Sequence, residues 1–181
     1  MVKRIEKFGA HKITIELADD HAVVREGIRL LLAGEKDMRV VGEARDGSEA
    51  AQLVRQLQPD VLIMDILMAP VDGIEAAREI LKENPSVKIV ALSACSEAEH
   101  VKPMMDLGAK GYMLKQDAVK NLPGAIRQVQ KGDLCFDPAK AKHLNPESPA
   151  LRGPKKKIQV SFRKVPGSKL EQKIKGTVPS A

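Results

Sequence analysis

Aromatic residues are scarce in this chain of 181 residues: they make up 2% of it, with one Tyr and no Trp. Recognition of bases or sugars by stacking on aromatic side chains is therefore not expected. Cysteine is equally rare, and Cys95 and Cys135 lie in no metal or redox motif, which favours a reducing compartment. We find no signal-peptide pattern and no apolar run approaching the roughly 20 residues that cross a bilayer. These absences predict a cytoplasmic protein without membrane contact.

Charge is abundant and unevenly divided along the chain. Residues 1–136 carry 19 Lys and Arg against 21 Asp and Glu, a net charge of −2, whereas residues 137–181 carry 11 against 3, a net charge of +8. Six of the eleven prolines also lie in the second stretch. This shift in composition predicts a globular part followed by a basic tail.

Short apolar segments alternate with amphipathic segments through the first part. The expected strands are 13–18, 38–44, 60–66, 87–92 and 110–114, and the expected helices are about 21–33, 48–57, 72–83, 97–107 and 118–131. Such alternation predicts an α/β fold, in which a five-stranded parallel sheet is covered by helices on both faces. Ligands of this architecture bind at the carboxyl ends of the strands.

Polar side chains stand at four of these strand ends. Asp19 and Asp20 follow the first strand and Asp65 the third, Ser93 follows the fourth, and Lys115 follows the fifth. Carboxylates brought together repel one another, so the group is expected to need a counter-cation. Mg²⁺ fits, because it is held by carboxylate oxygens together with water and phosphate oxygens.

An ordered set of motifs then resembles the receiver domains of two-component response regulators, in the subgroup named after NarL and FixJ. The resemblance covers about residues 12–132. Its motifs are Leu17-Ala18-Asp19-Asp20-His21, Val23-Val24-Arg25-Glu26-Gly27, Gly42-Glu43-Ala44, Gly47-Ser48-Glu49-Ala50, Pro59-Asp60-Val61, Met64-Asp65-Ile66, Asp72-Gly73, Ala91-Leu92-Ser93-Ala94 and Gly108 to Lys115. The family fold is flavodoxin-like, as in CheY: a doubly wound, five-stranded parallel sheet with five helices.

The resemblance implies a role for each of the residues at the strand ends. Asp65 would accept a phosphoryl group from a histidine kinase or a phosphotransfer protein, which makes the domain a switch rather than a turnover enzyme. Lys115 would pair with the bound phosphoryl group. Ser93 would turn inward to it and so alter the surface of the fourth helix, fifth strand and fifth helix.

The resemblance also implies a set of metal ligands. Asp20 and Asp65 would contact Mg²⁺ directly, with Asp19 beside them and the backbone carbonyl of Leu67 completing the protein ligands. Taken alone, Asp19 and Asp20 could instead cap the following helix, and Lys115 could be a solvated surface charge. His21 is expected to face solvent or to pack rather than to bind metal, because no second ligand lies at a useful spacing.

Several positions depart from the family pattern. Pro70 stands five residues after Asp65, where the family has its proline at the fourth. Pro103 and Pro123 fall inside expected helices, which must kink or start later; Pro123 could open a shortened helix over 123–131. Glu16 lies in the first strand, where burial without a partner would be unfavourable.

The sequence predicts three regions: an N-terminal extension over 1–11, a receiver domain over 12–132 and a basic, proline-rich tail over 133–181. Relatives in the subgroup usually carry a helix-turn-helix domain of roughly 60 residues after the receiver. The stretch from 137 is too short and too rich in proline for one, so we expect this output domain to be missing or replaced. Lys155-Lys156-Lys157 is the best candidate for contact with phosphate backbones, and a poorly ordered tail is the simpler interpretation.

Three functions follow from these observations. The first is a phosphoacceptor receiver that was ancestrally the regulatory half of a transcription factor. Whether it forms a homodimer stays an open question. The second is a regulator or sequence-tolerant binder of DNA that acts through the tail. The third is an adaptor that has lost phosphorylation, against which the complete set of acidic, hydroxyl and lysine residues argues.

Overall fold

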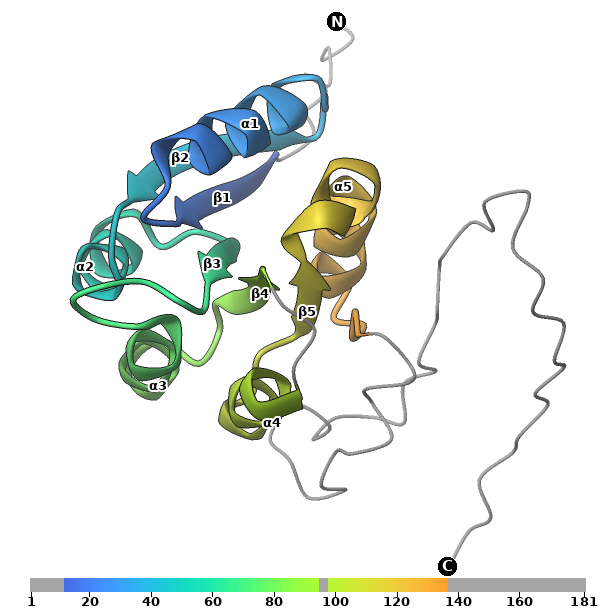
Figure 1. Ribbon diagram of the computed structural model, residues 1–181. Coiled ribbons are helices and arrows are strands. Elements are labelled where there is room, and N and C mark those ends of the chain that lie inside the picture. The colour runs from blue at the N-terminus through green and yellow to red at the C-terminus, as the bar shows by residue number, and fades with distance from the viewer. Residues whose placement is uncertain (1–11, 95–97, 137–181) are drawn as a thin grey trace, which may run out of the picture.

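The computed structural model describes residues 12–94 and 98–136, and these form a five-stranded parallel sheet between two layers of helices (Figure 1). The strand order is β2-β1-β3-β4-β5. The strands are β1 (Ile13–Ala18), β2 (Met38–Ala44), β3 (Val61–Asp65), β4 (Lys88–Ser93) and β5 (Gly111–Leu114). The flavodoxin-like fold with five strands and five helices is thus confirmed.

The helices divide between the two faces of the sheet. They are α1 (Ala22–Ala33), α2 (Gly47–Leu57), α3 (Gly73–Glu83), α4 (Ala98–Leu107) and α5 (Lys115–Gln130). Helices α1 and α5 cover one face, and α2, α3 and α4 cover the other (Figure 1). Alternate residues of β1 and β3 enter the two hydrophobic clusters, as expected for strands buried on both faces. The order of the strands reverses between β1 and β3, and the carboxyl ends of these two strands lie side by side.

Capping residues explain where two helices begin. The Asp46 side chain accepts a hydrogen bond from the backbone N–H of Glu49 at the start of α2, and Asp72 accepts one from Glu75 at the start of α3. Each interaction satisfies a backbone donor that the first helical turn leaves without a partner. Helix α1 is different, because its N-cap is His21 and no side chain caps it. The alternative interpretation of the neighbouring aspartates as helix caps is therefore wrong.

Two prolines lie inside helices rather than at their beginnings. Of the two alternatives for the last helix, about 118–131 or a shortened helix over 123–131, the shortened one is wrong, because α5 begins at Lys115 and continues to Gln130. Pro103 likewise lies within α4. Pro123 has no N–H to donate to the carbonyl of Val119 one turn earlier. Val119 itself is 71% exposed. The Pro123 ring itself is buried, which offsets part of the lost hydrogen bond.

Glu16 is buried in the middle of β1, as its position predicts. It is 0% exposed, and neither carboxyl oxygen has a hydrogen-bond partner. Burial, with a smaller contribution from the nearby charge of Glu49, raises the pKa of Glu16 to about 8. The carboxyl group is therefore mostly protonated at neutral pH, which avoids an uncompensated charge inside the sheet.

The chain stays packed on the domain beyond α5. Leu134 and Phe136 are buried in the cluster beneath α3 and α4, and Cys135 forms a parallel bridge with Gly111 at the edge of β5. The packed unit extends to Phe136, where the composition shift lies. Cys95, the N-terminal extension over 1–11 and the tail from 137 lie outside the described residues. Within the described part of the chain, no helix combines the length and the apolar character that spanning a bilayer requires.

Candidate functional site

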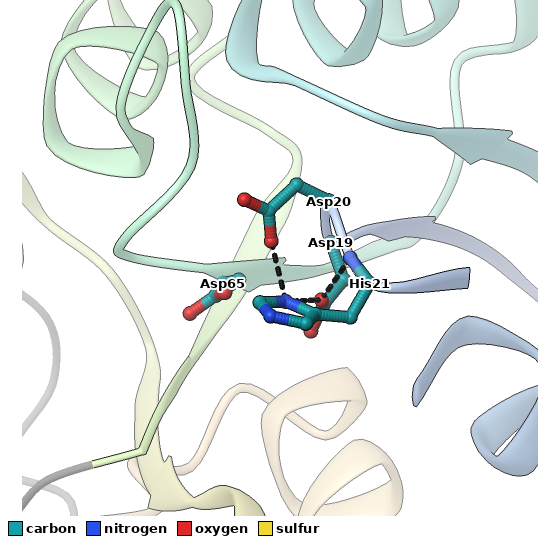
Figure 2. Close-up of side chains that lie close together, drawn as sticks. All are labelled: Asp19, Asp20, His21 and Asp65. Carbon is teal, nitrogen blue, oxygen red and sulfur yellow. Dashed lines mark hydrogen bonds and ion pairs between the residues drawn. The ribbon is translucent and has the colours of Figure 1, made fainter. Parts of the chain in front are cut away.

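An acidic cluster lies at the carboxyl ends of β1 and β3. Asp19 and Asp20 follow β1 directly, and Asp65 is the last residue of β3. Because β1 and β3 are paired in parallel up to Ala18 and Met64, the aspartates that follow are brought to one place. Figure 2 shows these three side chains together with His21, and one potential ligand atom from each lies within 4.8 Å of the others.

Lys115 connects two of these carboxylates. Its Nζ lies 2.6 Å from Oδ2 of Asp65 and 2.7 Å from Oδ2 of Asp19. The lysine is the first residue of α5 and follows the edge strand β5, so it comes from the same end of the sheet as the aspartates but from the side of β5. Since only 18% of this side chain is exposed, the interpretation of Lys115 as a solvated surface charge is wrong.

Burial and the neighbouring charges set the protonation of the cluster. Burial raises the pKa of Asp65 above its ordinary value, although the hydrogen bond from Lys115 acts in the opposite direction. Burial alone would lower the pKa of Lys115, but hydrogen bonds to Asp19 and Asp65 outweigh it, so the pKa of the lysine is raised. The ammonium group is therefore charged at neutral pH and stabilises the ionised carboxylates beside it.

The loop after β3 forms hydrogen bonds to the Asp65 side chain and to the main chain of the next residue. The backbone N–H of Leu67 donates to Oδ1 of Asp65 at 3.3 Å, and the N–H of Gly73 donates to the carbonyl of Ile66 at 2.9 Å. The peptide bond between Ala69 and Pro70 is cis. Helix α3 begins at Gly73, against the backbone of Asp65.

Ser93 and His21 border the cluster in different ways. Ser93 is the last residue of β4 and is 0% exposed; the residue before it, Leu92, is in register with Asp65. The His21 side chain is 66% exposed, as expected, but its Nδ1 lies 2.6 Å from Oδ1 of Asp20 (Figure 2). Metal-ligand spacing between distant residues could not predict this contact, because His21 is adjacent to Asp20 and its side chain folds back over that aspartate.

Sequence reasoning also missed Arg25, in the first half of α1. Its Nη1 donates a hydrogen bond of 2.6 Å to the main-chain carbonyl of Asp19. Only 13% of the Arg25 side chain is exposed. The signal available in the sequence was an arginine one helical turn after the loop that carries the acidic pair.

The composition of the cluster suits a hard divalent cation. Asp19 and Asp65 have side chains that are 3% exposed, and Asp20 adds a third carboxylate that is 35% exposed. Lys115 supplies one positive charge to these three carboxylates, so the cluster retains an excess of negative charge in a partly buried position. Carboxylate oxygens in this number are the ligands that Mg²⁺ uses in proteins. The residues present therefore fit the metal.

The family model described as the response regulator receiver domain matches residues 15–127. The response regulator GacA of Pseudomonas aeruginosa is 38% identical over 132 residues, which are 73% of this chain and 62% of that protein. The chain spans 56% to 62% of the length of the first curated relatives that it matches.

Two solved structures extend this likeness to the fold. A two-component response regulator of the LuxR family from Aurantimonas sp. SI85-9A1 has a TM-score of 0.68 at 32% identity, covering 72% of this chain and 94% of that one. The isolated receiver domain of RcsB from Salmonella enterica serovar Typhimurium, solved in the presence of the phosphomimetic BeF3−, has a TM-score of 0.66 at 30% identity, covering 75% and 100%. With the fold, the acidic cluster and these relatives in agreement, the chain belongs to the response regulator receiver family of two-component systems, as a receiver of the NarL and FixJ type.

Proposed function

We propose that Asp65 accepts a phosphoryl group from a histidine kinase or a phosphotransfer protein, and that the chain acts in the cytoplasm as a switch of a two-component phosphorelay rather than as a turnover enzyme. The observation that carries the proposal is the position of the Asp65 carboxylate. It lies at the end of a central strand, bonded to Lys115 and next to Asp19 and Asp20. This arrangement places a nucleophile and the groups that balance its charge in one site.

The transfer forms one bond and breaks another. A carboxylate oxygen of Asp65 attacks the phosphorus, the new P–O bond makes an acyl phosphate, and the bond from phosphorus to the donor imidazole nitrogen breaks. The electron pair of that bond leaves with the imidazole, which then takes up a proton. The Lys115 ammonium, now on Asp65 Oδ2, would turn to the oxygens of the incoming phosphoryl group and neutralise part of their charge.

Asp20 and Asp65 would hold Mg²⁺ directly, with Asp19 beside them and the carbonyl of Leu67 as a further ligand. When bound, the metal supplies positive charge to the phosphoryl oxygens during transfer. Asp19 also holds Lys115 at 2.7 Å, so the same carboxylate would orient the lysine and contribute to the negative field.

Ser93 would couple phosphorylation of Asp65 to a conformational change at the surface. Its hydroxyl is buried at the end of β4, between Asp65 on β3 and the β5 strand that leads to Lys115. A hydrogen bond from Ser93 to the phosphoryl group would draw the end of β4 toward β3. The helix that follows, α4, would then move relative to β5 and α5, and this change is the proposed output.

The direct test is incubation with acetyl phosphate and Mg²⁺, followed by intact-mass measurement. The native chain should gain the mass of one phosphoryl group, and Asp65→Asn should gain none. Asp46→Asn is a matched control, because asparagine also caps helices and Asp46 lies at the start of α2 rather than in the cluster. Equal uptake by the native chain and Asp65→Asn would refute the assignment.

DNA contact through the basic tail is the second candidate function, and the net charge of +8 over residues 137–181 favours it. Binding through counterion release falls steeply as salt rises. Three results of a DNA retention assay would together support this function. Retention should weaken as salt rises, disappear when residues 137–181 are deleted, and stay unchanged when acetyl phosphate is added. Retention that depends on both DNA sequence and phosphorylation would contradict the view that the tail cannot read a groove.

A further inference from the structure

The main chain of Asp19 is hydrogen-bonded both before and after its Cα atom. The N–H of Asp19 donates to the carbonyl of Ala44 on β2 at 3.2 Å. The carbonyl of Asp19, which belongs to the peptide unit joining it to Asp20, accepts the 2.6 Å hydrogen bond from Nη1 of Arg25. Rotation of that peptide unit would change the directions of both side chains, so the hydrogen bond from Arg25 fixes the relative placement of two carboxylates.

Arg25 lies beside the carboxylate of Glu43, although its Nε forms no hydrogen bond within the described part of the chain. Its side chain is largely buried, and its Nε lies 3.5 Å from Oε2 of Glu43 on β2. Arg29, one turn later on α1, lies 4.0 Å from the other oxygen of Glu43 and also pairs with Glu26. A run of alternating charges therefore joins α1 to β2 and ends at the Asp19 carbonyl.

Arg25 could act on the acidic cluster through its positive charge or through its hydrogen bond to the Asp19 carbonyl. The negative charge on Glu43 offsets the charge on Arg25. A guanidinium beside a carboxylate contributes little net field to the acidic cluster. The directed hydrogen bond to the carbonyl is what remains, and charge-assisted hydrogen bonds of this length are among the stronger ones in proteins. Groups that orient metal ligands without touching the metal commonly change metal affinity when they are removed.

We infer that Arg25 is a positioning residue for the divalent cation of this receiver: it fixes the peptide unit between Asp19 and Asp20 and so presets the acidic pair for binding. The inference rests on the proposed function of the site. It concerns the affinity for the metal rather than the transfer step, because among the described residues the Arg25 side chain bonds to the Asp19 carbonyl and pairs with Glu43, not with Asp65 or Lys115.

The test compares Arg25→Met, Arg25→Lys and Arg29→Met with the native chain. Titration with Mg²⁺ alone, followed by backbone amide NMR shifts, should show affinity about 10-fold weaker or more for Arg25→Met. Arg25→Lys keeps a donor on a flexible stem and should fall between. Arg29→Met should stay within about 2-fold of native, because Arg29 shares Glu43 but does not contact Asp19.

The second readout is the rate of phosphorylation by acetyl phosphate as a function of Mg²⁺ concentration. Arg25→Met should need more Mg²⁺ to reach half its limiting rate, while the limiting rate stays within about 2-fold of native. Native affinity in Arg25→Met, or a loss of rate that saturating Mg²⁺ does not recover, would overturn the inference. If Arg25→Met does not fold, Arg25→Lys must show the same shift in Mg²⁺ dependence. A native chain that binds no Mg²⁺ would instead overturn the proposed metal site as a whole.

Discussion

Gly73 lies directly against the main chain of Asp65: a Cβ added to this glycine would stand 2.2 Å from the Asp65 carbonyl oxygen and 3.0 Å from the Cα of Ile66. The first residue of α3 therefore packs on the backbone of the proposed phosphoacceptor. This contact, with the hydrogen bond from Gly73 N–H to Ile66, fixes the end of β3 against the start of α3. Backbone atoms cannot move aside as a flexible side chain can, so any larger residue must displace the strand end.

Gly73→Ala should destabilise the fold by about 2 kcal/mol and slow phosphorylation of Asp65, because the displaced carbonyl shifts the attached carboxylate. Thermal unfolding and the acetyl phosphate assay measure the two effects. Gly27→Ala in α1 is the matched control, since nothing lies within 4 Å of its added Cβ. There alanine should stabilise by about 0.5–1 kcal/mol. Equal stability changes for the two variants would contradict the close contact at Gly73.

Lys115→Met should leave two buried carboxylates without their cation and lower stability at neutral pH by about 3 kcal/mol. Added Mg²⁺ should restore more stability to this variant than to the native chain, because the metal then replaces the positive charge that Lys115 supplied to the two carboxylates. Unfolding midpoints with and without Mg²⁺ test the prediction. The exposed Lys120→Met in the same helix should show neither effect, and an equal response to Mg²⁺ in all three proteins would count against the metal site.

Glu16 should make stability fall as pH rises. The pKa of Glu16 is raised from 4.5 to about 8 in the folded chain, so the folded state holds the proton that the unfolded state has lost. The favourable contribution is complete below pH 4.5 and is lost progressively up to about pH 8. Glu16→Gln should remove this dependence and increase stability at pH 8.5 by on the order of 4 kcal/mol, since each tenfold change in proton affinity is worth about 1.4 kcal/mol.

Denaturant unfolding of the native chain and Glu16→Gln between pH 5 and pH 8.5 measures the Glu16 effect. Glu75→Gln is the matched control, because it replaces a glutamate at the surface instead of one inside the sheet. Parallel profiles for the native chain and Glu16→Gln would show that Glu16 is not the buried acid responsible.

Pro123→Ala should stabilise α5 by about 1 kcal/mol. The alanine restores an N–H to the carbonyl of Val119 and removes the clash of the ring with the preceding turn, while the loss of a buried ring offsets part of the gain. Thermal unfolding and the helical circular dichroism signal are the measurements. A loss of stability would mean that packing of the Pro123 ring outweighs the interrupted hydrogen bond.

Local patterns were enough to predict most of the architecture. The period of apolar residues predicted the exact bounds of β1 and β2, and the bounds of the other strands to within one residue at each end. Helix α5 was expected at about 118–131, and its observed start at Lys115 is the largest difference among the helices. The alternative start at Pro123 follows from the local preference of proline for the first turn of a helix. The packing of the Pro123 ring in the core could not be deduced from the sequence near it.

The candidate site was likewise predictable from the sequence only in part. The sequence by itself determined that carboxylates, a hydroxyl and a lysine follow four strands, because chain order and residue type are enough to place them at the end of a parallel sheet. Only the tertiary structure decided which of these groups touch: that Lys115 joins Asp19 to Asp65, and that Arg25 reaches back to the carbonyl of Asp19. Distances of this kind depend on how helices pack against strands far away in the chain, and no local pattern encodes them.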